Sequence, residues 1–274
     1  MSRSVPAVAC VGDNCVDVYV DAGGVERVGG NALNVALELA RAGHATAYFG
    51  AVGTDARGQM VLAGARAGGV DVTHAVVAVG ATGVTLVGHD ERGERRFDSE
   101  EYGVAADYRV PVTDEPLLRR KRWVHAARQP DLARWSPGVR GAGARVSCDL
   151  NDGGPGALDA AVDVAFASAG DAGDAAALAM AHVLRDRGAE LAVVTLGAAG
   201  SLAHSAGGTW RQPAIPVDVV DSLGAGDAFI AGVIGALLGG GDVASALLAG
   251  AHAGAEACTR VGLAGDVPHA EVTT

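Results

Sequence analysis

The sequence predicts an α/β fold built on a mostly parallel sheet. The chain has 274 residues, 49% of them hydrophobic, which suits a single α/β domain with a sizeable core. Apolar runs at residues 5–11 and 46–52 indicate strands, and the runs at 31–41 and 55–67 indicate helices that end near glycines. Such alternation of strands and helices is typical of parallel α/β architecture.

A different pattern follows between these elements and the second half of the chain. Two short strand-like runs, residues 82–87 and 95–97, flank a turn-rich segment and predict a hairpin. Together with a strand at 16–20, this hairpin is expected to form a small sheet outside the main core. We expect that sheet to act as a lid made by residues 14–28 and 82–102.

The α/β pattern then resumes. No internal repeat and no long linker divides the sequence, so we expect one domain over residues 1–274. The predicted helices are 174–187, 225–238 and 243–260, and the predicted strands are 123–126, 145–150, 164–167 and 191–196, followed by a hairpin over 201–204 and 210–212.

Charge, hydropathy and cysteine usage restrict the class of protein. The net charge of −11 at pH 7 argues against a nucleic-acid partner, which would require a basic face. The longest strongly apolar stretch, residues 228–241, is too short to cross a bilayer, so we expect no membrane span. None of the four cysteines forms a CxxC pair, which favours reduced thiols in a cytoplasm over a zinc site or disulfides.

Two nucleotide-dependent classes fit poorly. The opening strand is followed by Gly-Asp-Asn-Cys at residues 12–15 and not by GxGxxG, which argues against a dinucleotide-dependent oxidoreductase. A P-loop protein needs a lysine in GxxxxGK[ST]. The only lysine, Lys121, lies in an Arg-Arg-Lys-Arg run that is typical of a solvated charge cluster.

Residues 217–229 carry the strongest chemical signal. A β-rich run enters a glycine-containing turn there, and a long apolar helix follows. Glycines let backbone approach a ligand, and the amides of a helix N-terminus favour an anion. A carboxylate at Asp227 would place a base beside that anion site, as phosphoryl transfer to a hydroxyl requires. Asp227 alone would also suit an ordinary helix N-terminus, and Ala-Gly-Asp occurs three more times in the chain.

Three motifs together resemble the ribokinase-like (PfkB) carbohydrate kinases. Asp-Ser-Leu-Gly-Ala-Gly-Asp at residues 221–227 resembles the C-terminal signature of that family. Gly-Gly-Asn-Ala-Leu-Asn-Val-Ala at 29–36 resembles its N-terminal signature, and Val-Val-Thr-Leu-Gly-Ala-Ala-Gly at 193–200 resembles its nucleotide-binding segment. The motifs occur in family order over essentially the whole chain. The resemblance implies a ribokinase-like three-layer α/β/α fold with a β-sheet lid.

The resemblance also implies the residues for ATP and catalysis. Asp227 would be the catalytic base, Gly224 would supply the turn, and the amides of Ala225, Gly226 and Asp227 would form the anion hole. The family uses Mg²⁺ and often a monovalent cation such as K⁺ near the position of Asp221. The residues expected to contact ATP are Thr195, Gly197 and Gly200.

Candidate sugar contacts come from the N-terminal half. Gly29 and Gly30 would let backbone approach a sugar, and Asn34 can donate to and accept from hydroxyls. Asn34 would equally suit the first turn of a helix. Polar side chains that follow the first strand suit either polyol recognition or an ordinary turn; they are Asp13, Asn14 and Asp17. The resemblance implies that Asp17 contacts sugar hydroxyls.

The sequence departs from the family pattern at two places. Asn31 stands where the family often has lysine after the Gly-Gly pair, which argues against ribokinase itself. Ser168-Ala-Gly-Asp171 stands where the family has Asn-x-x-Glu. Asp171 could replace the glutamate and hold Mg²⁺ through water, while an equivalent role for Ser168 is open.

A narrower resemblance is to the fructoselysine 6-kinases, carried by residues 11–19, 29–36, 124–127 and 166–169. It implies phosphorylation of the 6-hydroxyl of a fructose carried on a lysine amine. The acidic segment 98–102 could then face the ammonium groups of the substrate, and Arg92, Arg95 or Arg96 its carboxylate, although a solvated hairpin explains them equally.

Three alternatives remain open at this point. They are a kinase of another sugar, a kinase of a nucleoside, and a catalytically silent sugar-binding regulator with the same fold. The resemblance also makes a homodimer through the lid plausible.

Overall fold

A computed structural model describes residues 7–89, 95–150 and 154–260. Its main sheet has eight strands in the order β14-β13-β12-β11-β10-β9-β1-β4. The strands from β4 to β12 pair in parallel, and the last two pairings are antiparallel. The strands are β1 (Val8–Gly12), β4 (Thr46–Phe49), β9 (Trp123–Ala127), β10 (Arg145–Asp149), β11 (Val162–Ser168), β12 (Ala189–Thr195), β13 (Ser201–Ser205) and β14 (Gly208–Gln212).

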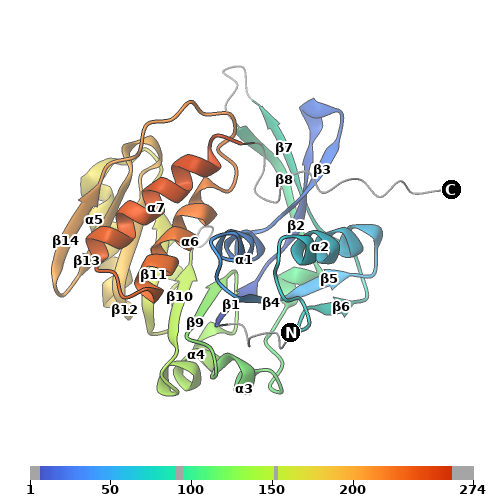
Figure 1. Ribbon diagram of the computed structural model, residues 1–274, viewed down its shortest axis with the longest axis horizontal. Helices are drawn as coiled ribbons and strands as arrows, with labels where there is room; N and C mark the ends of the chain where they lie inside the picture. Colours follow the sequence, from blue (N-terminus) through green and yellow to red (C-terminus); the bar gives the residue numbers. More distant parts are fainter. Residues whose placement is uncertain (1–6, 90–94, 151–153, 261–274) are drawn as a thin grey trace.

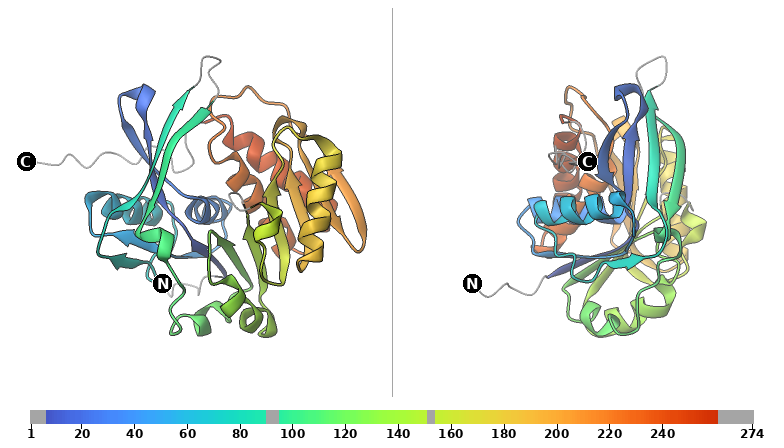
Figure 2. Two further views of the ribbon diagram at one scale, coloured as in Figure 1. Left: turned by 180° about the vertical axis from the view of Figure 1, so that it is seen from behind. Right: turned by 90° about the vertical axis from the view of Figure 1, so that its right-hand side faces the viewer.

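Helices cover both faces of this sheet. Alternate residues of each central strand point to opposite faces, so Val8 and Cys10 pack with α1 and α6, whereas Ala9 and Val11 pack with α4. In Figure 1 α6 and α7 lie in front of the sheet, and the view from behind in Figure 2 brings α5 to the front. The helices are α1 (Asn31–Arg41), α2 (Ala56–Ala67), α3 (Glu115–Leu118), α4 (Leu132–Gly141), α5 (Gly173–Asp186), α6 (Ala225–Leu238) and α7 (Val243–Ala257).

A second sheet stands outside this three-layer core and is called the lid sheet below. Its four strands follow the order β3-β2-β7-β8, and they project away from the main sheet in Figure 1. The strands are β2 (Cys15–Tyr19), β3 (Val25–Gly29), β7 (Thr82–His89) and β8 (Arg95–Gly103). The three-layer fold with a small separate sheet, and the hairpin within it, are therefore confirmed.

The sequence prediction was wrong at residues 46–52. The structure ends β4 at Phe49 and begins β5 (Ala51–Gly53) after Gly50, and β5 pairs with β6 (Val76–Ala78) in a separate two-stranded sheet. A Cβ on Gly50 would lie 2.0 Å from the Tyr48 hydroxyl oxygen, so only glycine fits between the end of β4 and the start of β5.

Helices α3 and α4 were missed in the sequence. Pro137 lies inside α4 and weakens its helical pattern, although the helix buries Trp135 and Val139 against the sheet. In the described part of the chain, no helix has the length and apolar character needed to cross a membrane.

Ser147 organises a buried polar contact between β9 and β10. Trp123 Nε1 donates to Ser147 Oγ at 2.8 Å, and His125 Nδ1 lies 2.9 Å from the same oxygen. Burial lowers the pKa of His125 to about 3, so its imidazole is neutral at pH 7. A neutral Nδ1 can accept the hydroxyl proton of Ser147, so one hydroxyl contacts both rings, whereas His125 Nε2 has no hydrogen-bond partner among the described residues.

Replacing Ser147 by alanine should therefore destabilise the protein. Ser147→Ala leaves the Trp123 donor and the His125 acceptor buried without this partner, which should cost about 1–3 kcal/mol of unfolding free energy. Urea denaturation measures the loss, and Ser99→Ala on the exposed surface of β8 serves as the control. Equal stability of the two variants would contradict the assigned role.

Candidate active site

The start of α6 combines a glycine turn with unoccupied backbone donors. Gly224 precedes the helix in the left-handed conformation, with φ 76° and ψ 2°, which suits glycine. The amide of Ala225 donates to the carbonyl oxygen of Ser222 at 3.2 Å. In the described part of the chain, the amides of Gly226 and Asp227 have no acceptor. The start of α6 therefore offers two backbone donors and the positive end of the helix dipole, a combination that suits an anion.

Asp227 lies in the first turn of α6 and contacts a residue from the other half of the chain. Its side chain is 6% exposed. Asn34 of α1 donates from Nδ2 to Asp227 Oδ2 at 2.8 Å across a separation of 193 residues. The buried Asn34 Oδ1 has no hydrogen-bond partner among the described residues. Two residues predicted separately, the base and a sugar contact, are thus brought together.

The charge environment of Asp227 favours its protonated form. Burial raises its pKa well above the ordinary carboxyl value, and the neighbouring carboxylates of Asp149, Asp13 and Asp17 raise it further. The hydrogen bond from Asn34 acts in the opposite direction. Asp227 is therefore a stronger base than an ordinary aspartate when it is ionised.

Asp149 is a site residue that the sequence reasoning missed. It ends β10, and the strand register aligns it with Ala127 of β9, which in turn pairs with Gly12 of β1. Asp13 follows Gly12 directly, so both carboxylates lie at the carboxyl edge of the parallel sheet. An aspartate that ends a buried parallel strand was the available signal, because ligands of α/β proteins bind at this edge.

The Gly-Gly pair allows two chain segments to approach closely. A Cβ on Gly29 would lie 2.2 Å from Asp17 Oδ2, and a Cβ on Gly30 would lie 2.3 Å from the Cα of Asn14. Gly30 also has φ 103°, which strains any other residue. Asp13 accepts from the amides of residues 31 and 32 at 3.0 Å each, so it caps α1. The pair therefore holds Asp13 and Asp17 against the start of α1.

Asn14 has a clear contact within the protein. Its side chain is fully buried, and Nδ2 donates to the Tyr48 hydroxyl at 2.9 Å and to the carbonyl oxygen of Ala51 at 2.6 Å. These bonds connect Asn14, which precedes β2 of the lid sheet, to the ends of β4 and β5 that meet at Gly50. The sugar contact predicted for Asn14 stays a prediction.

One cavity collects the residues predicted for ATP. It has a volume of about 530 Å³ and includes Thr195, Gly197 and Gly200 in its lining. Ser222, Ala225 and Gly226 line it as well, so the cavity reaches the start of α6. Its apolar wall suits a flat base and is formed by Ile215, Pro216, Val217, Val219 and Phe229.

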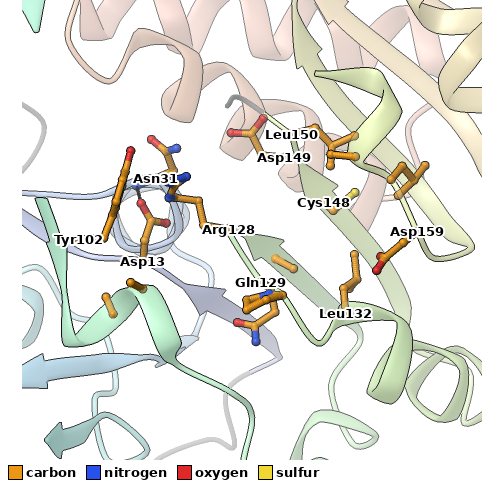
Figure 3. Close-up of a pocket in the computed structure, with 16 residues that line it drawn as sticks. Asp13, Asn31, Tyr102, Arg128, Gln129, Leu132, Cys148, Asp149, Leu150 and Asp159 are labelled. Atoms are coloured by element: carbon orange, nitrogen blue, oxygen red, sulfur yellow. Dashed lines mark hydrogen bonds between the residues drawn. The ribbon is translucent and has the colours of Figure 1, made fainter. Parts of the chain in front are cut away.

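A second cavity lies at the carboxyl ends of β1, β9 and β10. It has a volume of about 350 Å³. Figure 3 shows Asp13, Asn31, Tyr102 and Arg128 close together, with Asp149 opposite them. Of these, Tyr102 comes from strand β8 of the lid sheet. Asp13 and Asp149 of this cavity act electrostatically on Asp227, which is therefore close to both cavities.

The two predicted metal residues lie in different surroundings. Asp171 is exposed, and its Oδ1 lies 3.7 Å from the position of a Cβ on Gly197 of the ATP cavity. Asp221 is buried, accepting from the Leu223 amide at 2.7 Å and from the Tyr19 hydroxyl at 3.4 Å. No group of three or more metal-binding side chains occurs within residues 7–89, 95–150 and 154–260. Both metal assignments stay predictions.

Comparisons with known proteins agree with this site. The model of the pfkB family of carbohydrate kinases matches residues 7–119 and 164–270. Fructoselysine 6-kinase of Shigella flexneri is 36% identical over 232 residues, which is 83% of this chain and 87% of that protein. A fructosamine kinase of Bacillus subtilis is 30% identical over 255 residues, which is 90% of this chain and 89% of that protein.

Solved structures give the same fold. Arabidopsis thaliana ribokinase in complex with ribose and ATP aligns with a TM-score of 0.81 at 22% identity, covering 94% of each chain. Fructokinase from Xylella fastidiosa with bound ATP aligns with a TM-score of 0.78 at 25% identity, covering 94% of this chain and 93% of that one. The chain therefore belongs to the pfkB family of carbohydrate kinases and is an ATP-dependent phosphotransferase that acts on a sugar hydroxyl.

Proposed function

We propose that the protein phosphorylates the 6-hydroxyl of a fructosamine such as fructoselysine. The observation that carries this proposal is the pair of buried carboxylates, Asp13 and Asp149, that line the second cavity. A fructosamine carries a cationic amine that a plain sugar lacks, and buried carboxylates favour a cation. Relatives named for fructosamine substrates, at 30–36% identity, support the same substrate class.

The reaction is an in-line transfer of the γ-phosphoryl group of ATP. Asp227 accepts the proton of the sugar hydroxyl as that oxygen bonds to phosphorus and the bond to the ADP oxygen breaks. Asn34 Nδ2 orients the Asp227 carboxylate, and Asn34 Oδ1 is available to accept a second sugar hydroxyl. The amides of Gly226 and Asp227 stabilise the charge on the transferred group. Gly29 and Asp17 belong to the sugar side of this arrangement.

The proposed reaction uses two cations, one at the phosphates of ATP and one near the start of α6. Mg²⁺ would neutralise phosphate charge, with Asp171 as its water-mediated partner beside the ATP cavity. A monovalent cation such as K⁺ would bind near Asp221, whose carboxylate is buried close to the start of α6. The Asp221 and Asp171 carboxylates have the oxygen chemistry that hard cations prefer.

The lid sheet is proposed to cover the bound sugar during the reaction. It would close over the sugar and exclude water, which suppresses hydrolysis of ATP. Tyr19 of β2 already contacts Asp221 beside α6, and Tyr102 of β8 lines the second cavity. We further propose a homodimer through this sheet and a cytoplasmic location. The latter agrees with four free cysteines.

A substrate panel tests the proposed function. Release of ADP from ATP and Mg²⁺ would be measured with fructoselysine, related fructosamines, fructose, ribose, 2-keto-3-deoxygluconate and nucleosides. Turnover confined to fructosamines, with phosphate on the 6-hydroxyl by ³¹P–¹H NMR, is the expected result. Preferred turnover of a plain sugar or a nucleoside would reject the fructosamine proposal, and turnover of nothing with ATP still bound would favour a silent regulator.

Replacing Asp227 by asparagine should lower activity and raise stability. Asp227→Asn should reduce kcat by about 100- to 10,000-fold, while calorimetry should show ATP binding largely intact. The pKa of Asp227 is raised in the folded protein, so its ionised form costs folding free energy at neutral pH. Asparagine removes that cost, and Tm should rise by about 2–4 °C for each kcal/mol recovered.

The control for this prediction is Asp186→Asn, an exposed residue at the end of α5. This variant should change neither kcat nor Tm. Near-normal turnover by Asp227→Asn would contradict the assignment of the base.

Loss of Asn34 should change the pH dependence of the reaction. The Asn34 hydrogen bond lowers the pKa of Asp227, so Asn34→Ala should move the acid limb of the kcat/KM profile to higher pH by about one unit. Gln59→Ala, which removes an exposed amide from α2, should retain the wild-type limb. An Asn34→Ala profile that falls equally at every pH would indicate only a structural role.

A further inference from the structure

Arg128 has an unusual backbone conformation in the second cavity. It is the only non-glycine residue with a positive φ among the described residues, at 46°. It directly follows β9 and lines the cavity. Such a conformation costs free energy and persists where the surrounding structure imposes it, often at binding sites.

The guanidinium of Arg128 is held by the lid sheet. Its central carbon lies 3.4 Å from the centre of the Tyr102 ring, a cation–π contact. Figure 3 shows the two side chains beside Asn31 and Asp13. Stacking on an aromatic face leaves the N–H groups at the edge of the planar guanidinium directed outward. Because the group has several donors, it can serve a protein neighbour and a ligand together.

Arg128 and Asp13 line the same cavity, and Asp13 acts electrostatically on Asp227. The charge of Arg128 lowers the pKa of Asp13, and Asp13 in turn raises the pKa of Asp227. The 6-hydroxyl and C1 are at opposite ends of fructose. With the 6-hydroxyl at Asp227, a sugar that occupies the second cavity would direct C1 and its amine into the space lined by Arg128.

The remaining walls of this cavity suit an aliphatic chain. Apolar surface in the lining comes from Leu132, Leu150, Leu158 and Pro130. The apolar residues fit the carbon skeleton of an amino acid. Among the residues of the lining, Arg128 is the basic one and lies with the carboxylates of Asp13, Asp149 and Asp159, which suits a substrate that carries both an amine and a carboxylate. Within the segment 98–102 that was predicted to recognise the substrate, Tyr102 is the residue that lines the cavity.

We propose that Arg128 binds the carboxylate of the amino acid that the fructosamine carries, an inference that rests on the proposed function. A guanidinium recognises a carboxylate through two parallel charge-assisted hydrogen bonds. Tyr102 is the positioning residue that orients it. The enzyme thereby selects sugar amines that are joined to an amino acid over those joined to a simple amine.

Two matched substrate pairs test this selection. One pair is fructoselysine and the fructose adduct of 1,5-diaminopentane, and the other is fructosylglycine and the fructose adduct of methylamine. Within each pair only the carboxylate differs. The wild-type enzyme should show about a 10- to 100-fold higher kcat/KM for the carboxylate-bearing member of at least one pair. The pair that shows the preference reveals how far the carboxylate lies from the sugar.

Variants of Arg128 assign the preference to its side chain. Arg128→Gln should reduce the ratio to within about threefold, because it lowers kcat/KM more for the carboxylate-bearing member than for the simple amine adduct. Arg128→Lys keeps the charge but not the planar fork, so it should give an intermediate ratio. Both variants keep a Cβ and therefore the same backbone cost. Arg66→Gln, exposed near the end of α2, is the control that removes a distant charge.

The outcomes separate this inference from the proposed function. Equal use of both members of each pair by the wild-type enzyme, or a preference retained by Arg128→Gln, overturns the role of Arg128 while the fructosamine kinase stands. Turnover of plain sugars with none of fructosamines overturns both. Because the wild-type ratio is itself a test, the inference can fail even if an Arg128 variant does not fold.

Discussion

The hydrogen bond between Asn34 and Asp227 is the contact on which the active site depends. It joins α1 to α6 across 193 residues of sequence, so the proposed base, Asp227, is in place only when both halves of the chain have folded. Each partner is held by its own helix start. Asp13 caps α1, and the left-handed Gly224 opens α6. The contact also opposes the effect of burial on the pKa of Asp227, so geometry and basicity are set by the same interaction.

The parallel sheet explains why distant residues meet at this point. Asp13 follows β1, Asp149 ends β10 and Thr195 ends β12, and the carboxyl ends of parallel strands share one edge. Asp227 lies near that edge, close to a cavity lined by the residues predicted to bind ATP and to a second cavity whose lining includes Tyr102 of the lid sheet. Transfer between two ligands requires this arrangement, because each must approach the base from its own side.

Residues within short motifs were predictable from sequence, whereas contacts between elements were not. Thr195, Gly197 and Gly200 occur in one motif, and the structure places all three in the lining of one cavity, while their contact with ATP stays a prediction. The stacking of Arg128 on Tyr102 joins β9 to the lid sheet and has no local signal. Asp149 escaped notice because it stands outside the motifs. The division between β4 and β5 at Gly50 could not be predicted, because residues 46–52 form one apolar run. It is explained by the close approach of the Tyr48 hydroxyl to Gly50 in the folded chain.

The ionisation of Asp227 tests the central claim most directly. Carbon-13 NMR of protein labelled at the aspartate carboxyl carbons would follow each group through a pH titration, with Asp227→Asn identifying the resonance. The account predicts that Asp227 titrates well above the ordinary carboxyl value of 3.8, and higher still in Asn34→Ala. Titration of Asp227 at its ordinary value, unchanged by loss of Asn34, would contradict a buried base that is tuned by that hydrogen bond.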